Sequence, residues 1–234
     1  MTSRITREIL DQHLVPKEDY IYGFADLKGV IDEQFGDFRF GISIGKRLDD
    51  RIVDRIYSGP TIEYYTHYRQ VNEELALLTQ SISEDLMRIG TETLCIEPTV
   101  TTQELDTVYS KDLITRLSHK MVATRAGLGW IGKSDLFISN AFGPRLRLVS
   151  ILTNAPLECD VLPVEKSRCG NCKLCMDKCP AKAISGKLWD ISVDRNEFFN
   201  AFKCRQMCKE FGEKYLNMNV RVCGICVAVC PHGW

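Results

Sequence analysis

The segment Cys169-Gly-Asn-Cys172-Lys-Leu-Cys175-Met-Asp-Lys-Cys179-Pro180 decides how the C-terminal part of the chain folds. Its cysteines follow the spacing C-x2-C-x2-C-x3-C-P. Three thiolates two residues apart line one tight loop and can hold three irons of a single [4Fe–4S] cubane, whereas the fourth points away and can serve a second cluster. Pro180 suits the first turn of a helix, so we expect a helix to begin there.

A structural zinc site is the alternative for these cysteines. Zinc takes four ligands, usually from two separated C-x2-C pairs, and has no use for three cysteines in one loop. The observed run is instead typical of bacterial ferredoxins that carry two clusters. We therefore expect iron–sulfur clusters.

A second, incomplete motif lies near the C-terminus. Cys223-Gly-Ile-Cys226-Val-Ala-Val-Cys230-Pro231 has the spacing C-x2-C-x3-C-P and lacks the first cysteine of a full run. The missing ligand must come from upstream, where Cys204 and Cys208 are the candidates, and we favour Cys204. The crossed ligation rule then predicts two [4Fe–4S] clusters. Cluster 1 takes Cys169, Cys172, Cys175 and Cys230, and cluster 2 takes Cys179, Cys204, Cys223 and Cys226, with Cys208 as the alternative to Cys204.

The composition is typical of a globular protein from a reducing compartment. The chain has 234 residues, 44% of them apolar, and a formal net charge of −1, which gives no global field for nucleic acid or anionic lipid. Its 11 cysteines are an odd number, which argues against a secreted disulfide framework. No apolar run approaches the ~20 residues of a spanning helix, and the N-terminus lacks the apolar core of a signal peptide. We expect a cytoplasmic protein with no membrane association.

The distribution of cysteines predicts two domains, residues 1–158 and 159–234. The first contains one cysteine, Cys95, which we interpret as a buried small apolar residue, and the second contains ten. Residues 159–234 hold 12 Lys and Arg against 8 Asp and Glu, an excess that offsets the negative charge of two clusters. We interpret five of these basic residues as counter-charges: Lys173, Lys178, Lys182, Arg205 and Arg221.

Hydrophobic periodicity predicts an α/β fold for residues 1–158. Helices are expected over residues 3–14, 61–89 and 119–126, and strands over residues 20–27, 38–45 and 93–96. The stretch Asn140-Ala-Phe-Gly-Pro144 is a turn signal, so residues 135–139 and 145–153 should pair with each other as a hairpin.

A glycine-rich stretch between these parts is a candidate ligand-binding loop. Arg125-Ala-Gly127-Leu-Gly129-Trp130-Ile-Gly132-Lys133 places three glycines within six residues, and glycine lets a backbone approach a ligand closely. A tight helix-to-strand turn is the alternative interpretation. Our candidate cofactor-binding residues are Gly127, Gly129, Trp130, Gly132 and Lys133.

Together these motifs resemble epoxyqueuosine reductase. The glycine-rich stretch, the segment Leu152-Thr-Asn-Ala-Pro-Leu-Glu158 and the two cysteine motifs follow that family's order over residues 118–231. The resemblance implies an α+β architecture, in which a nitroreductase-like α/β domain, as in reductive dehalogenases, precedes a bacterial 2[4Fe–4S] ferredoxin-like domain. It also implies a reaction in which two clusters and cobalamin reduce the epoxide of a modified tRNA wobble base.

The family's acidic proton donor precedes the glycine-rich stretch. Counted back from Arg125, its position falls on Leu113, beside Asp112, and Arg116 replaces the proline of the family's motif. A histidine at a helix N-terminus has a lowered pKa and can act as a neutral donor or a ligand. Our candidate catalytic residues are therefore Asp112, Tyr109 and His119, each with a structural role as its alternative.

Three functions fit these observations. We favour a reductase in which a low-potential donor of the ferredoxin or flavodoxin type sends electrons through both clusters to a corrinoid or small-molecule substrate, held in residues 1–158 and clamped by the glycine-rich stretch. The second is a non-catalytic electron carrier that docks a partner enzyme, which a pocket lined by Gly127, Gly129 and His119 would disfavour. The third is a tRNA-modifying epoxyqueuosine reductase proper. Because the chain ends four residues after Cys230, we expect no C-terminal repeat domain of the kind that helps this family bind tRNA.

Overall fold

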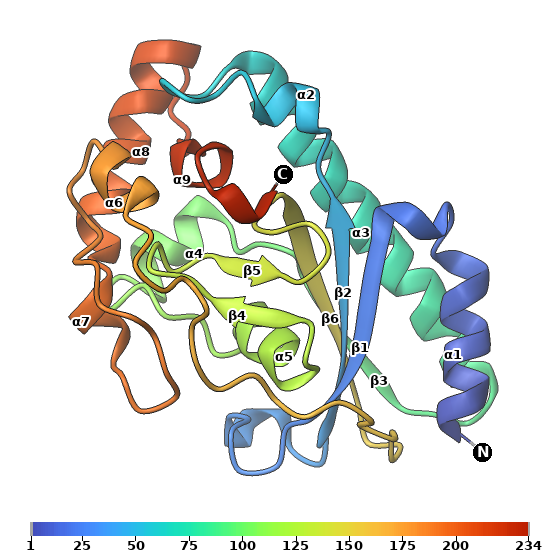
Figure 1. Cartoon of the computed structure of the whole chain (residues 1–234). Coiled ribbons are helices and arrows are strands. Elements are labelled where there is room, and N and C mark those ends of the chain that lie inside the picture. Colours follow the sequence, from blue (N-terminus) through green and yellow to red (C-terminus); the bar gives the residue numbers. More distant parts are fainter. Residues whose placement is uncertain (1, 234) are drawn as a thin grey trace.

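A four-stranded antiparallel sheet forms the centre of the computed structural model, which describes residues 2–233 (Figure 1). Its strands are β1 (Tyr20–Asp26), β2 (Phe40–Arg47), β6 (Leu146–Thr153) and β3 (Thr93–Ile96), in that spatial order. β2 and β6 lie in the middle, and Ile42 pairs with Ile151 in their register. β-branched side chains at such positions favour strands because they pack well on a pleated surface.

Helices cover both faces of this sheet. Successive residues of a strand face opposite sides, and Ile42 is buried in the main core with Leu75 of α3 (Ile62–Arg88). α1 (Thr2–His13) contributes to the same core. A Cβ placed on Gly41 would lie 2.8 Å from Val122 of α5 (His119–Arg125), so α5 covers the opposite face (Figure 1).

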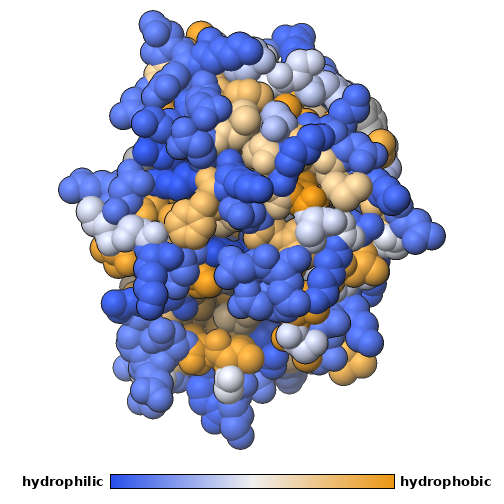
Figure 2. Space-filling view, turned by 90° about the vertical axis from the view of Figure 1, so that its left-hand side faces the viewer, coloured by the Kyte–Doolittle hydropathy of each residue, from blue (hydrophilic) through white to orange (hydrophobic). Residues whose placement is uncertain are grey.

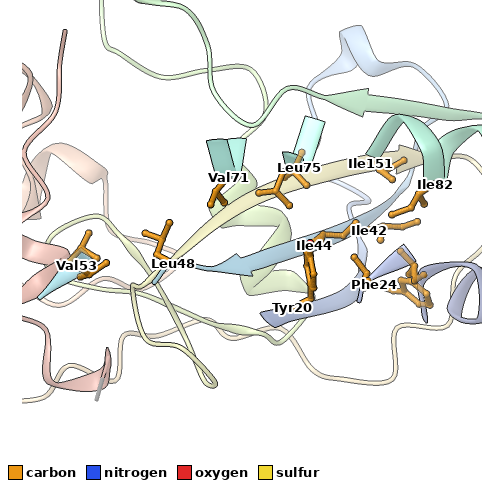
Figure 3. Packing of buried hydrophobic residues seen from close by; sticks show 14 of the residues in the cluster. Tyr20, Phe24, Ile42, Ile44, Leu48, Val53, Val71, Leu75, Ile82 and Ile151 are labelled. Atoms are coloured by element: carbon orange, nitrogen blue, oxygen red, sulfur yellow. The ribbon is translucent and has the colours of Figure 1, made fainter. Parts of the chain in front are cut away.

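The main core lies between α3 and the sheet. Thr61 caps α3, because its side chain accepts a hydrogen bond from the backbone N–H of Tyr64, and Gly90 follows the last turn at φ 81°. Figure 3 shows how apolar side chains from several elements meet there: Tyr20, Phe24, Ile42, Ile44, Leu48, Val53, Val71, Leu75, Ile82 and Ile151.

This core extends into the cysteine-rich part of the chain. Leu216, Val222, Val227 and Ala228 are buried in the same cluster as Tyr64 of α3. The two predicted domains therefore share one hydrophobic core.

A separate two-stranded ribbon joins β5 (Phe137–Ser139) to β4 (Gly129–Ile131). The expected hairpin between residues 135–139 and 145–153 is therefore wrong. The turn forms and leaves a bridge between Ser139 and Gly143, but β2 and β3 occupy both edges of β6. β5 pairs with β4 instead, and Gly129 permits this because a Cβ there would lie 2.0 Å from the carbonyl oxygen of Ile138.

The remaining helices of the described chain are short. They are α2 (Asp50–Val53), α4 (Thr102–Thr107), α6 (Leu174–Lys178), α7 (Arg195–Phe198), α8 (Ala201–Phe211) and α9 (Ile225–Ala228), with single turns at Lys17–Asp19, Glu33–Phe35, Gly212–Leu216 and Pro231–Gly233. The helix expected to begin at Pro180 is wrong: α6 ends at Lys178 with Cys179 as its C-cap, and the proline that follows has no N–H to continue a helix. Between residues 2 and 233, none of the helices combines the length and the apolar character that crossing a membrane requires.

Candidate functional site

Four of the cysteines surround a small cavity between α6 and α9. Cys169 and Cys172 come from the turn that leads into α6, Cys175 lies in the first turn of α6, and Cys230 follows α9. Cys226 also reaches this cavity. The structure thus brings together the four residues predicted for cluster 1.

The end of the glycine-rich stretch supports this cysteine turn. The Lys133 side chain is only 5% exposed, and its Nζ donates hydrogen bonds of 2.8 Å to the carbonyl oxygens of Gly170 and Cys172. A Cβ on Gly132 would lie 3.5 Å from Sγ of Cys169. The buried ammonium group therefore fixes the backbone that carries the cluster 1 cysteines.

The other predicted cofactor-binding residues have packing contacts. Gly127 adopts φ 71° and lies against Val161, Gly129 belongs to β4, and the buried Trp130 ring meets the ring of His232 edge-on at 5.0 Å. None of the five residues lines the cavity of about 510 Å³ that lies over β6 and α5. The stretch is a helix-to-strand connection, and it clamps the cysteine turn.

A second cavity contains the cysteines predicted for cluster 2. Cys204 and Cys208 of α8, Cys179 after α6, and Cys223 and Cys226 beside α9 all line it. Burial raises the pKa of Cys223 to about 11 and raises that of Cys226 strongly. Because metal coordination deprotonates a thiol outright, such buried thiols become thiolates by binding iron.

Cys204 and Cys208 compete for the last position of cluster 2. They lie one turn apart on α8, with their sulfur atoms 4.0 Å from each other. Either thiol can donate in the hydrogen bond between them, and both line the cluster 2 cavity.

The second cavity also offers a cluster a buried hydrogen-bond donor that has no partner in the described chain. Nη1 of Arg221 is buried with no hydrogen-bond partner among residues 2–233, and Arg221 lines the cavity. The sulfurs of an iron–sulfur cluster accept hydrogen bonds, which help to set its potential. In the described part of the chain, no three His, Cys, Asp or Glu side chains converge as a single metal ion requires; the cysteines surround cavities instead.

A third cavity of about 510 Å³ lies in the first part of the chain, over β6 and α5. This volume is within the usual range for small-molecule sites, roughly 300–1,000 Å³. Its walls combine apolar side chains, among them Phe35, Leu136 and Leu148, with the basic residues Arg116, Lys120 and Arg147. We call it the large cavity.

The large cavity and the cluster 2 cavity share a wall. Leu136 and Arg147 line both of them. The Arg147 guanidinium lies 4.4 Å from the centre of the Tyr68 ring, and its Nε donates a 2.8 Å hydrogen bond to Asn72. Arg147 lowers the pKa of Tyr68 through its charge. The positively charged guanidinium of Arg147, fixed by Tyr68 and Asn72, therefore lies between the cluster 2 cavity and the large cavity.

His119 and Tyr109 line the large cavity, and Asp112 does not. His119 Nε2 is 2.8 Å from the carbonyl oxygen of Glu97, which can only accept, so Nε2 carries the proton. Nδ1, 2.9 Å away from the Ser150 hydroxyl, then accepts a hydrogen bond from it. Burial lowers the pKa of His119 to about 4. With both ring nitrogens used, this neutral imidazole joins α5 to β6 rather than facing a ligand.

Asp112 lies on the surface. Its carboxylate accepts a hydrogen bond from the N–H of Ile114, and its carbonyl oxygen accepts one from Arg195. The neighbouring Leu113 takes the left-handed conformation at φ 56°. Tyr109 is therefore the one of the three candidate catalytic residues whose side chain is available to the cavity.

Sequence reasoning missed Arg147, Leu136 and the orphaned Arg221 donor. Arg147 and Leu136 lie within the segments expected as a hairpin, and no motif marks them. The sequence did contain one indication, the two arginines of the β-rich run Arg145-Leu-Arg147-Leu. Charged residues are rarely buried in a sheet unless they are paired, so an arginine in such a run indicates a specific partner.

Comparison with known proteins identifies the cysteine-rich part. Residues 168–233 match the family described as "4Fe-4S double cluster binding domain". The chain is 36% identical over 111 residues to an epoxyqueuosine reductase of Lactococcus garvieae, covering 47% of this chain and 30% of that protein. It is 30% identical over 146 residues to one of Listeria monocytogenes, covering 60% and 37%. The matched region thus spans about a third of these relatives.

Solved structures share the fold of nearly the whole chain. An epoxyqueuosine reductase of Streptococcus thermophilus superposes with a TM-score of 0.61 at 18% identity, over 100% of this chain and 66% of that one. The catabolic reductive dehalogenase NpRdhA superposes with a TM-score of 0.66 at 15% identity, over 92% and 30%. The predicted α+β fold with a ferredoxin-like double-cluster domain is confirmed, as is the resemblance to epoxyqueuosine reductase.

Proposed function

We propose that this protein is an iron–sulfur reductase whose two [4Fe–4S] clusters deliver electrons to an acceptor in the large cavity. The observation that carries this proposal is the wall of Leu136 and Arg147, which the large cavity shares with the cluster 2 cavity. The bound clusters would supply one-electron transfer, with cluster 2 beside the cavity that would hold the acceptor. Each cluster transfers one electron at a time, so two transfers complete a two-electron reduction.

The chain's own residues have distinct roles in this proposal. Cys169, Cys172, Cys175 and Cys230 hold cluster 1, and Cys179, Cys204, Cys223 and Cys226 hold cluster 2. Lys133 positions the turn of cluster 1. Arg147 stabilises negative charge that develops between cluster 2 and the acceptor. Tyr109 donates the proton that a reductive cleavage consumes.

A corrinoid fits the large cavity in part. The apolar wall beside cluster 2 suits a macrocycle, and the basic side chains suit its amide and phosphate groups. His119 supplies no ligand for cobalt, because both of its nitrogens are hydrogen-bonded inside the protein. A bound corrinoid would therefore carry electrons from cluster 2 to the substrate without this histidine.

The large cavity favours a reductase over a simple electron carrier, because a carrier needs no cavity of this size next to a cluster. Reduction of a tRNA base remains a narrower form of the same proposal. It is supported by the relatives at 30–36% identity and by the likeness in fold to an epoxyqueuosine reductase solved with an epoxyqueuosine-modified tRNA stem loop.

Anaerobic titration of the reconstituted protein tests the proposal. A bound acceptor should change the EPR signal of reduced cluster 2 and leave that of cluster 1 unchanged. Hydroxocobalamin and a modified tRNA stem loop are the two probes, added separately. Tyr109→Phe should slow reoxidation by a proton-requiring acceptor at least tenfold with unchanged EPR signals. If neither probe binds or alters the cluster 2 signal, the reductase proposal fails in favour of the electron carrier.

A further inference from the structure

We propose that the surface over cluster 1 is the docking site for a small acidic protein that carries a low-potential one-electron centre. The α6 basic patch consists of Lys173, Leu174, Lys178 and Lys182, all exposed. Leu174 and Lys178 are the first and last residues of α6, the helix that directly follows the cluster 1 turn. This inference rests on the proposed function and adds the point at which electrons enter.

The basic residues of the cysteine-rich part divide into two groups. Arg205 and Arg221 have side chains only 17% exposed, and both bind the carboxylate of Asp106. Arg221 lines the cluster 2 cavity, and both arginines line a neighbouring cavity together with Cys204 and Cys208. Lys173, Lys178 and Lys182 form no salt bridge with any residue of the described chain, although Lys187 in the same segment pairs with Glu197. All three lysines are exposed, and Nζ of Lys182 donates a 3.5 Å hydrogen bond to the carbonyl oxygen of Asp177.

The charge of this segment exceeds what cluster 1 needs. Residues 166–187 contain six Lys and Arg and a single acidic residue, Asp177. An oxidised cluster with four thiolates carries a charge of about −2, which leaves a positive surplus. Exposed like charges without partners repel each other and attract an acidic surface, which speeds association.

Leu174 adds an apolar side chain to the patch. It is 44% exposed beside Lys173, and hydrophilic residues dominate the side of the molecule that carries α6, with apolar side chains scattered among them (Figure 2). An apolar contact ringed by charges is the usual anatomy of a transient protein interface. Such small interfaces suit redox partners that must dissociate after each transfer.

The position of the patch favours a protein donor over RNA. None of its four residues lines the large cavity, where an RNA base would have to be reduced. Lys173 and Leu174 lie between Cys172 and Cys175 of cluster 1, and Lys178 and Lys182 flank Cys179 on the same segment. One electron passes from the reduced donor to cluster 1, and the donor leaves oxidised.

Stopped-flow reduction by an acidic [2Fe–2S] ferredoxin tests this surface. The triple variant Lys173→Glu, Lys178→Glu, Lys182→Glu should lower the second-order rate constant at least tenfold at low ionic strength and remove most of its salt dependence. The rate at saturating donor should stay within twofold. Reduction by dithionite should still load both clusters, and the triple Gln variant should give an intermediate rate constant.

A matched control reverses two exposed charges outside the cysteine-rich part, Arg4→Glu and Lys28→Glu, and should leave the rate constant within twofold. The docking site would be overturned if the α6 charge reversals left the rate constant unchanged. It would also be overturned if the control reversals lowered the rate constant as much as the α6 reversals. A modified tRNA stem loop that loses affinity in the α6 variant while ferredoxin reduction stays fast would assign the patch to RNA. Because dithionite bypasses the patch, failure here is distinct from failure of the large cavity to bind an acceptor.

Discussion

Single side chains decide where the clusters are held. Lys133 is the clearest case, since a buried ammonium group with two carbonyl acceptors replaces the ligand contact that its sequence context suggests. Cys204 and Cys208 are a second case, because two thiols on one turn of α8 reach a position that needs a single ligand.

Serine variants distinguish these two thiols. Cys204→Ser should lose about half of the bound iron and the EPR signal of cluster 2, because Cys204 is the ligand that we propose and it lines the cluster 2 cavity. Cys208→Ser should keep most of its iron. The measurement is iron and sulfide content after anaerobic reconstitution, and the reverse pattern would assign Cys208.

Replacing Lys133 by Met should weaken the cluster 1 turn. The change removes two charge-assisted hydrogen bonds and leaves two carbonyl oxygens without a donor, which lowers the free energy of unfolding by about 3 kcal/mol. Urea unfolding and the cluster 1 EPR signal measure the effect. Lys28→Met, at an exposed site, is the control and should change stability by less than about 0.5 kcal/mol. A Lys133→Met protein with normal stability and cluster 1 occupancy would contradict the positioning role.

His119 should make the fold less stable in acid. Its pKa falls to about 4 in the folded chain, against ~6.5 when unfolded, so the unfolded state binds the extra proton between these values. Stability is therefore full above pH 6.5 and decreases as the pH falls toward 4, by about 2 kcal/mol between pH 7 and pH 5. Anaerobic urea unfolding at both values measures this change, and His119→Asn should flatten it. An unchanged slope in that variant would show that other groups cause it.

Among the helices and strands, the sequence correctly predicted the features that depend on interactions between residues close together in the chain. Thr61 and Gly90 bound α3 because capping and a left-handed turn act within a few residues. β1, β2 and β3 lie within two residues of their predicted positions. The β5–β6 hairpin was wrong because pairing depends on which edges are open, and β6 is occupied on both sides. That choice is tertiary, and a turn signal alone cannot reveal it.

The site divides in the same way. The spacing of the cysteines predicted two sets of ligands, and the structure gathers these cysteines around two cavities that share Cys226. The acceptor cavity was not predictable, because Leu136 and Arg147 reach it from β-rich segments that meet only after folding. The sequence correctly indicated a close approach to the backbone at three glycines, Gly127, Gly129 and Gly132. The atoms that approach them belong to other residues of the protein and not to a ligand.

For the whole molecule, the shared core implies that clusters and sheet unfold together. Arg145 joins the parts: it is 1% exposed, it pairs with Asp50 and Asp54 at 3.1 and 2.8 Å, and its Nη2 lies 3.5 Å from the carbonyl oxygen of Ala228 in α9. A buried guanidinium between two segments stabilises their docking only while its partners remain.

Arg145→Leu should therefore lower stability by about 3 kcal/mol, and cluster absorbance and sheet ellipticity should still be lost at the same, lower temperature. Arg51→Leu is the control, because Arg51 pairs with Asp49 on the surface and such pairs contribute less than about 1 kcal/mol. Cluster bleaching that shifts alone, with the sheet transition unchanged, would show two independent units.

The account depends on two cubanes in one chain, and metal analysis with EPR of the dithionite-reduced, anaerobically purified protein tests this most directly. Eight thiolate ligands predict about eight irons and eight sulfides per chain, with magnetic coupling between neighbouring reduced clusters. A colourless protein that carries zinc, or one with about four irons and an uncoupled signal, would contradict it.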